Sequence, residues 1–120
     1  MALHIGQREV RNVTVLDLEG QLVAGDEAAS FRNLIDTFIE ESKIWVLLNL
    51  KSVRMIDSSG LGELVSAYTT VRNKQGDVKL LNLTAKAKDL LQMTKLLTVF
   101  DVYDDEAKAI GALKASKTSA

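Results

Sequence analysis

The sequence contains no cysteine and a single histidine, His4, and these two scarcities exclude several classes of chemistry. Without cysteine the chain has neither a disulfide framework nor a thiolate metal site, which fits a reducing compartment. A serine nucleophile needs a base, and His4 is far in sequence from the serines considered below. One histidine and scattered carboxylates also make a weak set of metal ligands. The sequence therefore argues against serine–histidine catalysis and predicts no metal and no cofactor.

The chain also lacks an excess of one charge and a long apolar run. Its 15 basic and 16 acidic side chains nearly cancel, so neither a nucleic acid nor an anionic membrane is an expected partner. The apolar stretches are too short to span a bilayer. Residues 1–10 contain His, Gln, Arg and Glu where a signal peptide would be apolar. These features favour a cytoplasmic domain that binds a protein or a small ligand.

The length of 120 residues, 47% of them hydrophobic, suits a single domain over residues 1–120. Apolar runs of strand length alternate with segments of helical periodicity, which predicts an α/β fold with a mainly parallel sheet. The small, polar tail from about residue 115 is expected to fray. Strands are predicted at residues 13–18, 44–50, 78–83 and 98–103, and helices are predicted to begin near residues 26, 58, 84 and 104.

The decapeptide MIDSSGLGEL places an acid, two hydroxyls and two glycines where an apolar strand gives way to an apolar-faced helix. Helix capping accounts for Asp57, Ser58 and Ser59, and one of the serines is the expected cap. Capping does not explain Gly60 and Gly62, because each glycine in a helix costs up to about 1 kcal/mol relative to alanine. Glycines there would let the backbone of a second protein approach the hydroxyls, so the stretch is a predicted docking site.

Other functions of this stretch fit less well. Ile56 stands where a G-x-S-x-G nucleophile elbow has its first glycine, Val65 where a dinucleotide fingerprint has its third, and no phosphate loop is present. Asp57 could accept a phosphoryl group as in receiver domains, but the acidic pair that those domains need is replaced by Glu19-Gly20-Gln21. A modest basic cluster, more typical of a solvated helix face than of a phosphate site, consists of Lys86, Lys88 and Lys95.

Met-Ile-Asp-Ser-Ser-Gly-Leu-Gly after an apolar strand resembles the STAS domain family, and in particular its bacterial anti-sigma factor antagonists. The resemblance covers nearly the whole chain, because GQL, LLNL, KLLNLTAKAKDLLQMTKL and VFDVYDDEAKAI also occur in the family's order. It implies the STAS fold, an α/β fold with a four- to five-stranded mixed, mainly parallel sheet and about four helices, and no catalytic activity.

The resemblance also implies a function. In the antagonists the first serine of Asp-Ser-Ser-Gly, here Ser58, is phosphorylated by a partner that is both a serine kinase and the anti-sigma factor. The unphosphorylated form binds this partner and frees the sigma factor, and a metal-dependent serine phosphatase reverses the modification. The partner-binding residues are then expected to be Asp57, Ser58, Ser59, Gly60, Leu61 and Gly62.

Three residues depart from the family's pattern without touching the motif. Asn49 and Lys51 stand where many relatives have an acid and a small polar residue, and Lys95 replaces a frequent glycine that supplies a left-handed backbone. Two alternatives stay open: a STAS scaffold that does not switch, in a stress-sensing or lipid-transport complex, and a small-ligand or nucleotide-binding domain. The intact Asp-Ser-Ser-Gly favours the switching antagonist.

Overall fold

The alternation of apolar strands with amphipathic helices produces an α/β architecture in the computed structural model, which describes residues 3–118. It confirms the predicted class, with a five-stranded mixed sheet and four α-helices. In chain order the elements are β1 (Leu3–Val10), β2 (Val13–Leu22), α1 (Asp26–Glu40), β3 (Trp45–Ile56), α2 (Ser58–Asn73), β4 (Asp77–Leu81), α3 (Ala85–Met93), the 3-10 helix η1 (Leu96–Thr98), β5 (Val102–Tyr103) and α4 (Glu106–Thr118).

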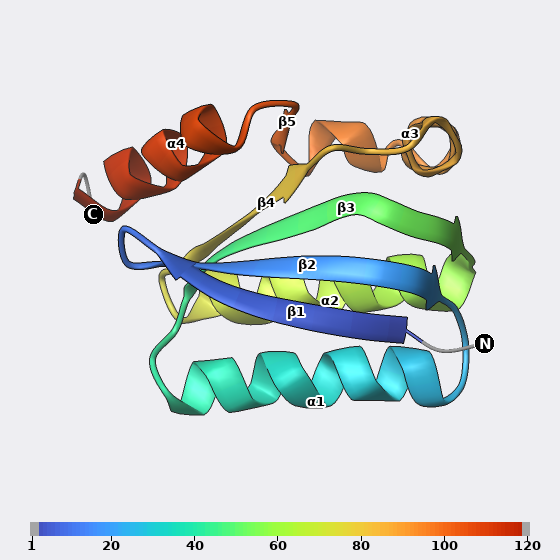
Figure 1. Ribbon diagram of the computed structural model, residues 1–120, viewed down its shortest axis with the longest axis horizontal. Coiled ribbons are helices and arrows are strands. Elements are labelled where there is room, and N and C mark those ends of the chain that lie inside the picture. Colours follow the sequence, from blue (N-terminus) through green and yellow to red (C-terminus); the bar gives the residue numbers. More distant parts are fainter. Residues whose placement is uncertain (1–2, 119–120) are drawn as a thin grey trace.

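The strands lie in the sheet in the same order as in the chain, β1-β2-β3-β4-β5. β1 is antiparallel to β2 and joins it through Arg11 and Asn12, both with positive φ, whereas the other neighbours are parallel. Parallel strands end at the same edge of a sheet, so the connections that follow β2, β3 and β4 gather there (Figure 1).

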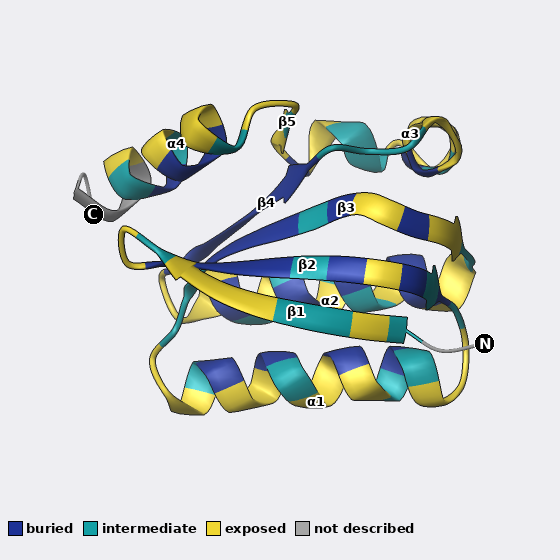
Figure 2. Ribbon diagram, in the orientation of Figure 1, coloured by how far each residue is buried: buried dark blue, intermediate teal, exposed yellow. Residues whose placement is uncertain are grey.

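The helices cover the two faces of the sheet unequally. One core cluster joins α1, α2 and α3 to the sheet and includes Phe31, Leu64 and Leu91. A smaller cluster joins α4 to the opposite face through contacts such as those of Ile110 and Leu47. Figure 2 shows the buried positions of α1 turned toward the sheet and its exposed positions turned away. The sheet is therefore fully covered on one face and only partly covered on the other.

β3 is longer than the sequence predicts. We expected a connection after Leu50, but residues 51–56 continue the strand and pair with the second half of β2, where Val53 lies opposite Gly20 and Ile56 opposite Leu22. The exposed polar residues at 51, 52 and 54 make this segment resemble a loop, yet Val53 is buried and anchors it. The extension carries the Asp-Ser-Ser-Gly stretch to the end of β2, next to the start of α1.

A polar ladder of Arg8, Asp17, Asn49 and Asn82 crosses the half of the sheet that α4 leaves open. Arg8 Nε donates to Asp17 Oδ2 (2.6 Å), Asn49 Nδ2 donates to Asp17 Oδ1 (2.8 Å), and Asn82 Nδ2 donates to Asn49 Oδ1 (3.3 Å). Arg8 also binds Glu106 at the start of α4. The Arg8 guanidinium and the Asn49 amide hold the pKa of Asp17 below its usual value. Asn49, one of the departures from the family's pattern, is thus a member of an ordered network.

At two turns, the residue with the left-handed backbone is not a glycine. Lys95 has φ 63° before η1, so the residue that replaces the family's glycine does adopt the left-handed conformation. A glycine, Gly76, follows α2 closely in the sequence, but the residue with positive φ there is Gln75, at 69°. Gly76 is required instead by a close approach, because a Cβ there would lie 2.1 Å from the carbonyl oxygen of Ile44.

The last helix, α4, continues through Thr118. The fraying expected from about residue 115 stays a prediction, and residues 119–120 lie outside the described part of the chain. Within residues 3–118, no helix has both the length and the apolar character needed to cross a membrane.

Candidate functional site

Asp57 is the N-cap of α2, and it also holds the connection between β2 and α1. Its Oδ1 accepts a hydrogen bond from the backbone N–H of Gly60 (2.8 Å), and its Oδ2 accepts one from the N–H of Ala24 (3.0 Å). Its own N–H points to the carbonyl oxygen of Leu22 (3.4 Å). One carboxylate therefore fixes the first turn of α2 against the loop that precedes α1. The sequence suggested a serine cap, and this is wrong because Asp57 occupies that position.

The charge of Asp57 is stabilised by these donors. The pKa of Asp57 lies below its usual value of 3.8, first because the Ala24 N–H donates to the carboxylate and second because the Gly60 N–H does so. A carboxylate with a lowered folded-state pKa stabilises the fold above the unfolded-state value, and this contribution is lost as the pH falls through the folded-state pKa.

Asp57→Asn tests this clamp. The asparagine amide can accept one of the two N–H groups but presents a donor to the other, so the melting temperature near neutral pH should fall. The difference from wild type, followed by circular dichroism, should narrow between about pH 7 and about pH 2.5, because the stabilisation from the charged carboxylate declines once the pH falls below its unfolded-state pKa. An equal difference at both pH values would show that the charge contributes nothing.

Ser58 and Ser59 lie in the first turn of α2 with exposed side chains. Neither hydroxyl makes a hydrogen bond to any residue that the structure describes. Because Asp57 performs the capping, both hydroxyls are free for another molecule. Met55, half exposed at the end of β3, is an apolar side chain close in sequence to this pair.

The two glycines of the motif have different roles. Gly60 is buried, and a Cβ on it would lie 2.0 Å from the carbonyl oxygen of Leu22. The interpretation of Gly60 as a clearance for a partner is therefore wrong, because the space beside it is filled by β2. Leu61 is also buried and belongs to the core, so its side chain is not available to a partner. Gly62 is exposed and has no atom within 4 Å of its Cβ position, so it leaves open surface as expected.

Neither serine has a histidine or a metal cluster beside it in the part of the chain that the structure describes. His4 lies on β1 opposite Glu19, and no hydrogen bond joins it to either serine. Glu63, one turn along α2, is bound to Arg32 of α1. In the described part of the chain, no group of three or more His, Cys, Asp or Glu side chains could hold a metal ion. The arrangement can present a hydroxyl to another protein, and it brings together Asp57, Ser58, Ser59 and Gly62 on one exposed helix start.

The sequence analysis missed two residues that shape the site, Leu22 and Ala24. Their contribution comes from the backbone, through the carbonyl against Gly60 and the N–H that reaches Asp57. Backbone groups have no side-chain signature, and the only sequence signal was that Gly20-Gln21-Leu22 precedes the first helix in the order expected of the family.

Fold and site together define a small α/β domain that presents a capped, serine-bearing helix start at the edge of its sheet. The model of the STAS domain family matches residues 5–109, and the chain belongs to this family. Over 117 residues the chain is 29% identical to an anti-sigma F factor antagonist from Paenibacillus polymyxa, covering 95% of this chain and 97% of that protein. Anti-sigma factor antagonists are regulators and not enzymes.

Solved structures show the same fold. A candidate anti-sigma factor antagonist from Thermotoga maritima superposes with a TM-score of 0.85 at 23% identity, covering 92% of this chain and 94% of that one. The phosphorylated form of the Bacillus cell fate determinant SpoIIAA superposes with a TM-score of 0.72 at 22% identity, covering 91% and 98%. These likenesses confirm the STAS fold predicted from the sequence.

Proposed function

We propose that this protein is a cytoplasmic anti-sigma factor antagonist. Its unphosphorylated form binds an anti-sigma factor that is also a serine kinase, and so frees a sigma factor. The observation that carries the proposal is the exposed Ser58 hydroxyl, which has no hydrogen-bond partner among residues 3–118 and lies in a turn that Asp57 already caps. Membership of the STAS family and similarity to an anti-sigma F factor antagonist support it.

The binding surface in this proposal is the exposed part of the motif. Asp57, Ser58, Ser59 and Gly62 contact the partner, whereas Gly60 and Leu61 lie behind them and set the position of the helix. Phosphorylation of Ser58 by the kinase ends binding, and a metal-dependent serine phosphatase restores it. That SpoIIAA has been solved in a phosphorylated form supports a switch of this kind.

Incubation with ATP tests the proposal. The protein alone should remain unmodified, because among the described residues neither the Ser58 nor the Ser59 hydroxyl is hydrogen-bonded to a base and no group of side chains could hold a metal ion. With its cognate kinase it should gain one phosphate on the peptide that contains Ser58, as measured by mass spectrometry. Autophosphorylation, or acid-labile phosphate on Asp57, would contradict the proposal and favour a receiver-like function.

A further inference from the structure

The connections that follow β4 and β5 lead to opposite faces of the sheet. β4 leads to α3, whose Leu91 joins the core cluster that also contains Phe31 of α1. β5 leads to α4, whose Ile110 packs on the other face with Val15. In open α/β sheets, a crevice forms beyond the carboxyl ends of two adjacent strands whose connections diverge in this way, and ligands bind in such crevices. The topology therefore points to a second site, after β4 and β5.

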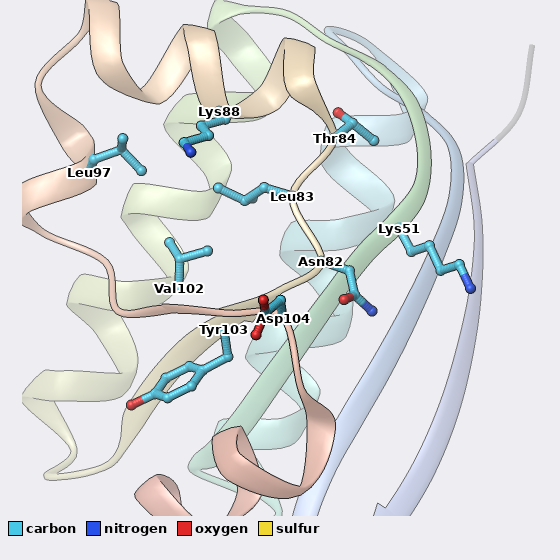
Figure 3. A pocket seen from close by; sticks show the side chains of 9 residues that line it. All are labelled: Lys51, Asn82, Leu83, Thr84, Lys88, Leu97, Val102, Tyr103 and Asp104. Carbon is cyan, nitrogen blue, oxygen red and sulfur yellow. The ribbon is translucent and has the colours of Figure 1, made fainter.

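A cavity of about 680 Å³ lies at this place. Its volume is within the range of roughly 300–1,000 Å³ that small-molecule sites occupy. Residues 55–62 do not line it, so it is separate from the surface assigned to the protein partner. Three of its lining side chains are apolar and come from three different segments, as Figure 3 shows; they are Leu83, Leu97 and Val102.

The three charged side chains that line this cavity, those of Lys51, Lys88 and Asp104, are exposed to solvent. Lys88 on α3 and Asp104 after β5 line it, and neither makes an ion pair or hydrogen bond with any described residue through its side chain. The Lys88 ammonium points toward Leu83 and Val102 (Figure 3). Two other lining residues are occupied or directed elsewhere: the Tyr103 ring lies 6.0 Å from the Lys79 ammonium, and Lys51 points away from Lys88. Lys88 is thus the cation that a ligand in the cavity would meet.

We propose that this cavity binds a small organic acid with one anionic group and an apolar body. The anionic group, a carboxylate or a phosphate monoester, pairs with Lys88, and the apolar body lies on Leu83, Leu97 and Val102. The Asp104 carboxylate would repel a second negative charge on the ligand, and this disfavours polyanions such as nucleoside triphosphates. The chain also has no phosphate loop that would hold them. The site thus selects for a single charge together with apolar surface.

Titration of the full chain with three aromatic probes, followed by amide chemical shifts in NMR, tests the proposal. Phenylacetate and phenyl phosphate carry the two anionic groups, and 2-phenylethylamine carries the opposite charge on a similar body. We expect saturable shifts concentrated at residues 82–84, 88 and 102–104 for at least one of the anions, and about tenfold weaker binding of the amine. The stronger of the two anions identifies the anionic group.

Matched variants separate a site from general attraction to lysines. Lys88→Gln should weaken binding of the preferred anion about tenfold, whereas Lys86→Gln, on the same helix but outside the cavity, should leave it unchanged. Val102→Thr keeps the shape of an exposed side chain and should weaken binding through the apolar contact. Equal effects of the two lysine variants, shifts spread over all of α3, or shifts that do not saturate would overturn the proposal. Binding of the anti-sigma factor is a separate measurement and can fail independently.

Discussion

Ser58→Asp is expected to lose most of its binding to the anti-sigma factor while its melting profile stays like that of wild type. Ser58 is exposed in the first turn of α2, where a negative charge is favoured by the free N–H groups of the helix. The fold therefore tolerates the new carboxylate, and also a phosphate of about −1.5 to −2 charges. In the proposed switch, the fold therefore stays intact and only partner binding changes.

Binding is affected because the new charge would be buried in the complex. In a close-packed interface it would lose water and face the ionised Asp57, which the N–H groups of Ala24 and Gly60 hold in its charged form. An uncompensated charge at an interface costs about 2–5 kcal/mol. This corresponds to a loss of affinity of roughly thirty- to several-thousand-fold. Calorimetry of the purified variant with its partner measures the effect.

Two further variants serve as controls. Ser58→Ala should bind like wild type and resist the kinase, and Ser59→Ala should still accept phosphate at Ser58. Because Asp57 and not Ser59 caps the helix, Ser59→Ala should also keep wild-type stability. Equal affinity of wild type and Ser58→Asp would support a STAS scaffold that does not switch. Phosphate found only on Ser59 would move the assignment to that residue.

Gly60→Ala and Gly62→Ala should change stability in opposite directions, although the two glycines are two residues apart in one helix. A methyl group on Gly60 would lie 2.0 Å from the carbonyl oxygen of Leu22, so α2 would have to move away from β2. Overpacking against backbone should lower the free energy of unfolding by about 3 kcal/mol. Gly62 has a helical backbone and open space around it, so alanine there should raise the free energy by about 0.5–1 kcal/mol.

Urea denaturation followed by circular dichroism measures both effects under the same conditions. Gly62→Leu tests partner binding. A bulky side chain on the open surface should weaken binding of the anti-sigma factor without unfolding the protein. If Gly60→Ala were as stable as wild type, α2 would not be packed against the end of β2 as the structure has it. If Gly62→Leu unfolded while its folded fraction bound normally, the surface would not be a docking site.

The sequence allowed the fold class and the alternation of strands and helices from β2 onward to be predicted, because buried strands and amphipathic helices have distinct periodicities. No strand was predicted where β1 lies, and the strand predicted at residues 98–103 is present only at Val102–Tyr103, after η1. The run at residues 44–50 and the helix after Asp26 both lie where periodicity placed them. The extension of β3 could not be predicted in this way. Its exposed face is polar, and only the buried Val53 and the pairing with β2, set by the tertiary structure, make it a strand.

The location of the candidate site could be predicted from the sequence, but the role of each residue in it could not. Asp57, Ser58 and Ser59 can all cap a helix, and the choice between them depends on where the end of β3 directs each side chain. Gly60 and Gly62 look alike in the sequence because both cost helix stability. They differ in their surroundings: the Leu22 carbonyl lies against Gly60, whereas nothing lies close to Gly62. Leu22 precedes Gly60 by almost 40 residues, so this contact could not be predicted from the local sequence.

The order of the strands in the sheet, the same as their order in the chain, bears on how the protein assembles during its synthesis. Each strand from β2 onward adds to an edge that the chain has already made, and none has to enter between two others. Pairing therefore links segments that are close in sequence, which favours fast folding. As the chain leaves the ribosome with its N-terminus first, the sheet can grow one strand at a time. The last strand to arrive, β5, pairs through only two residues, so the growing edge ends in one of the shortest segments of the fold.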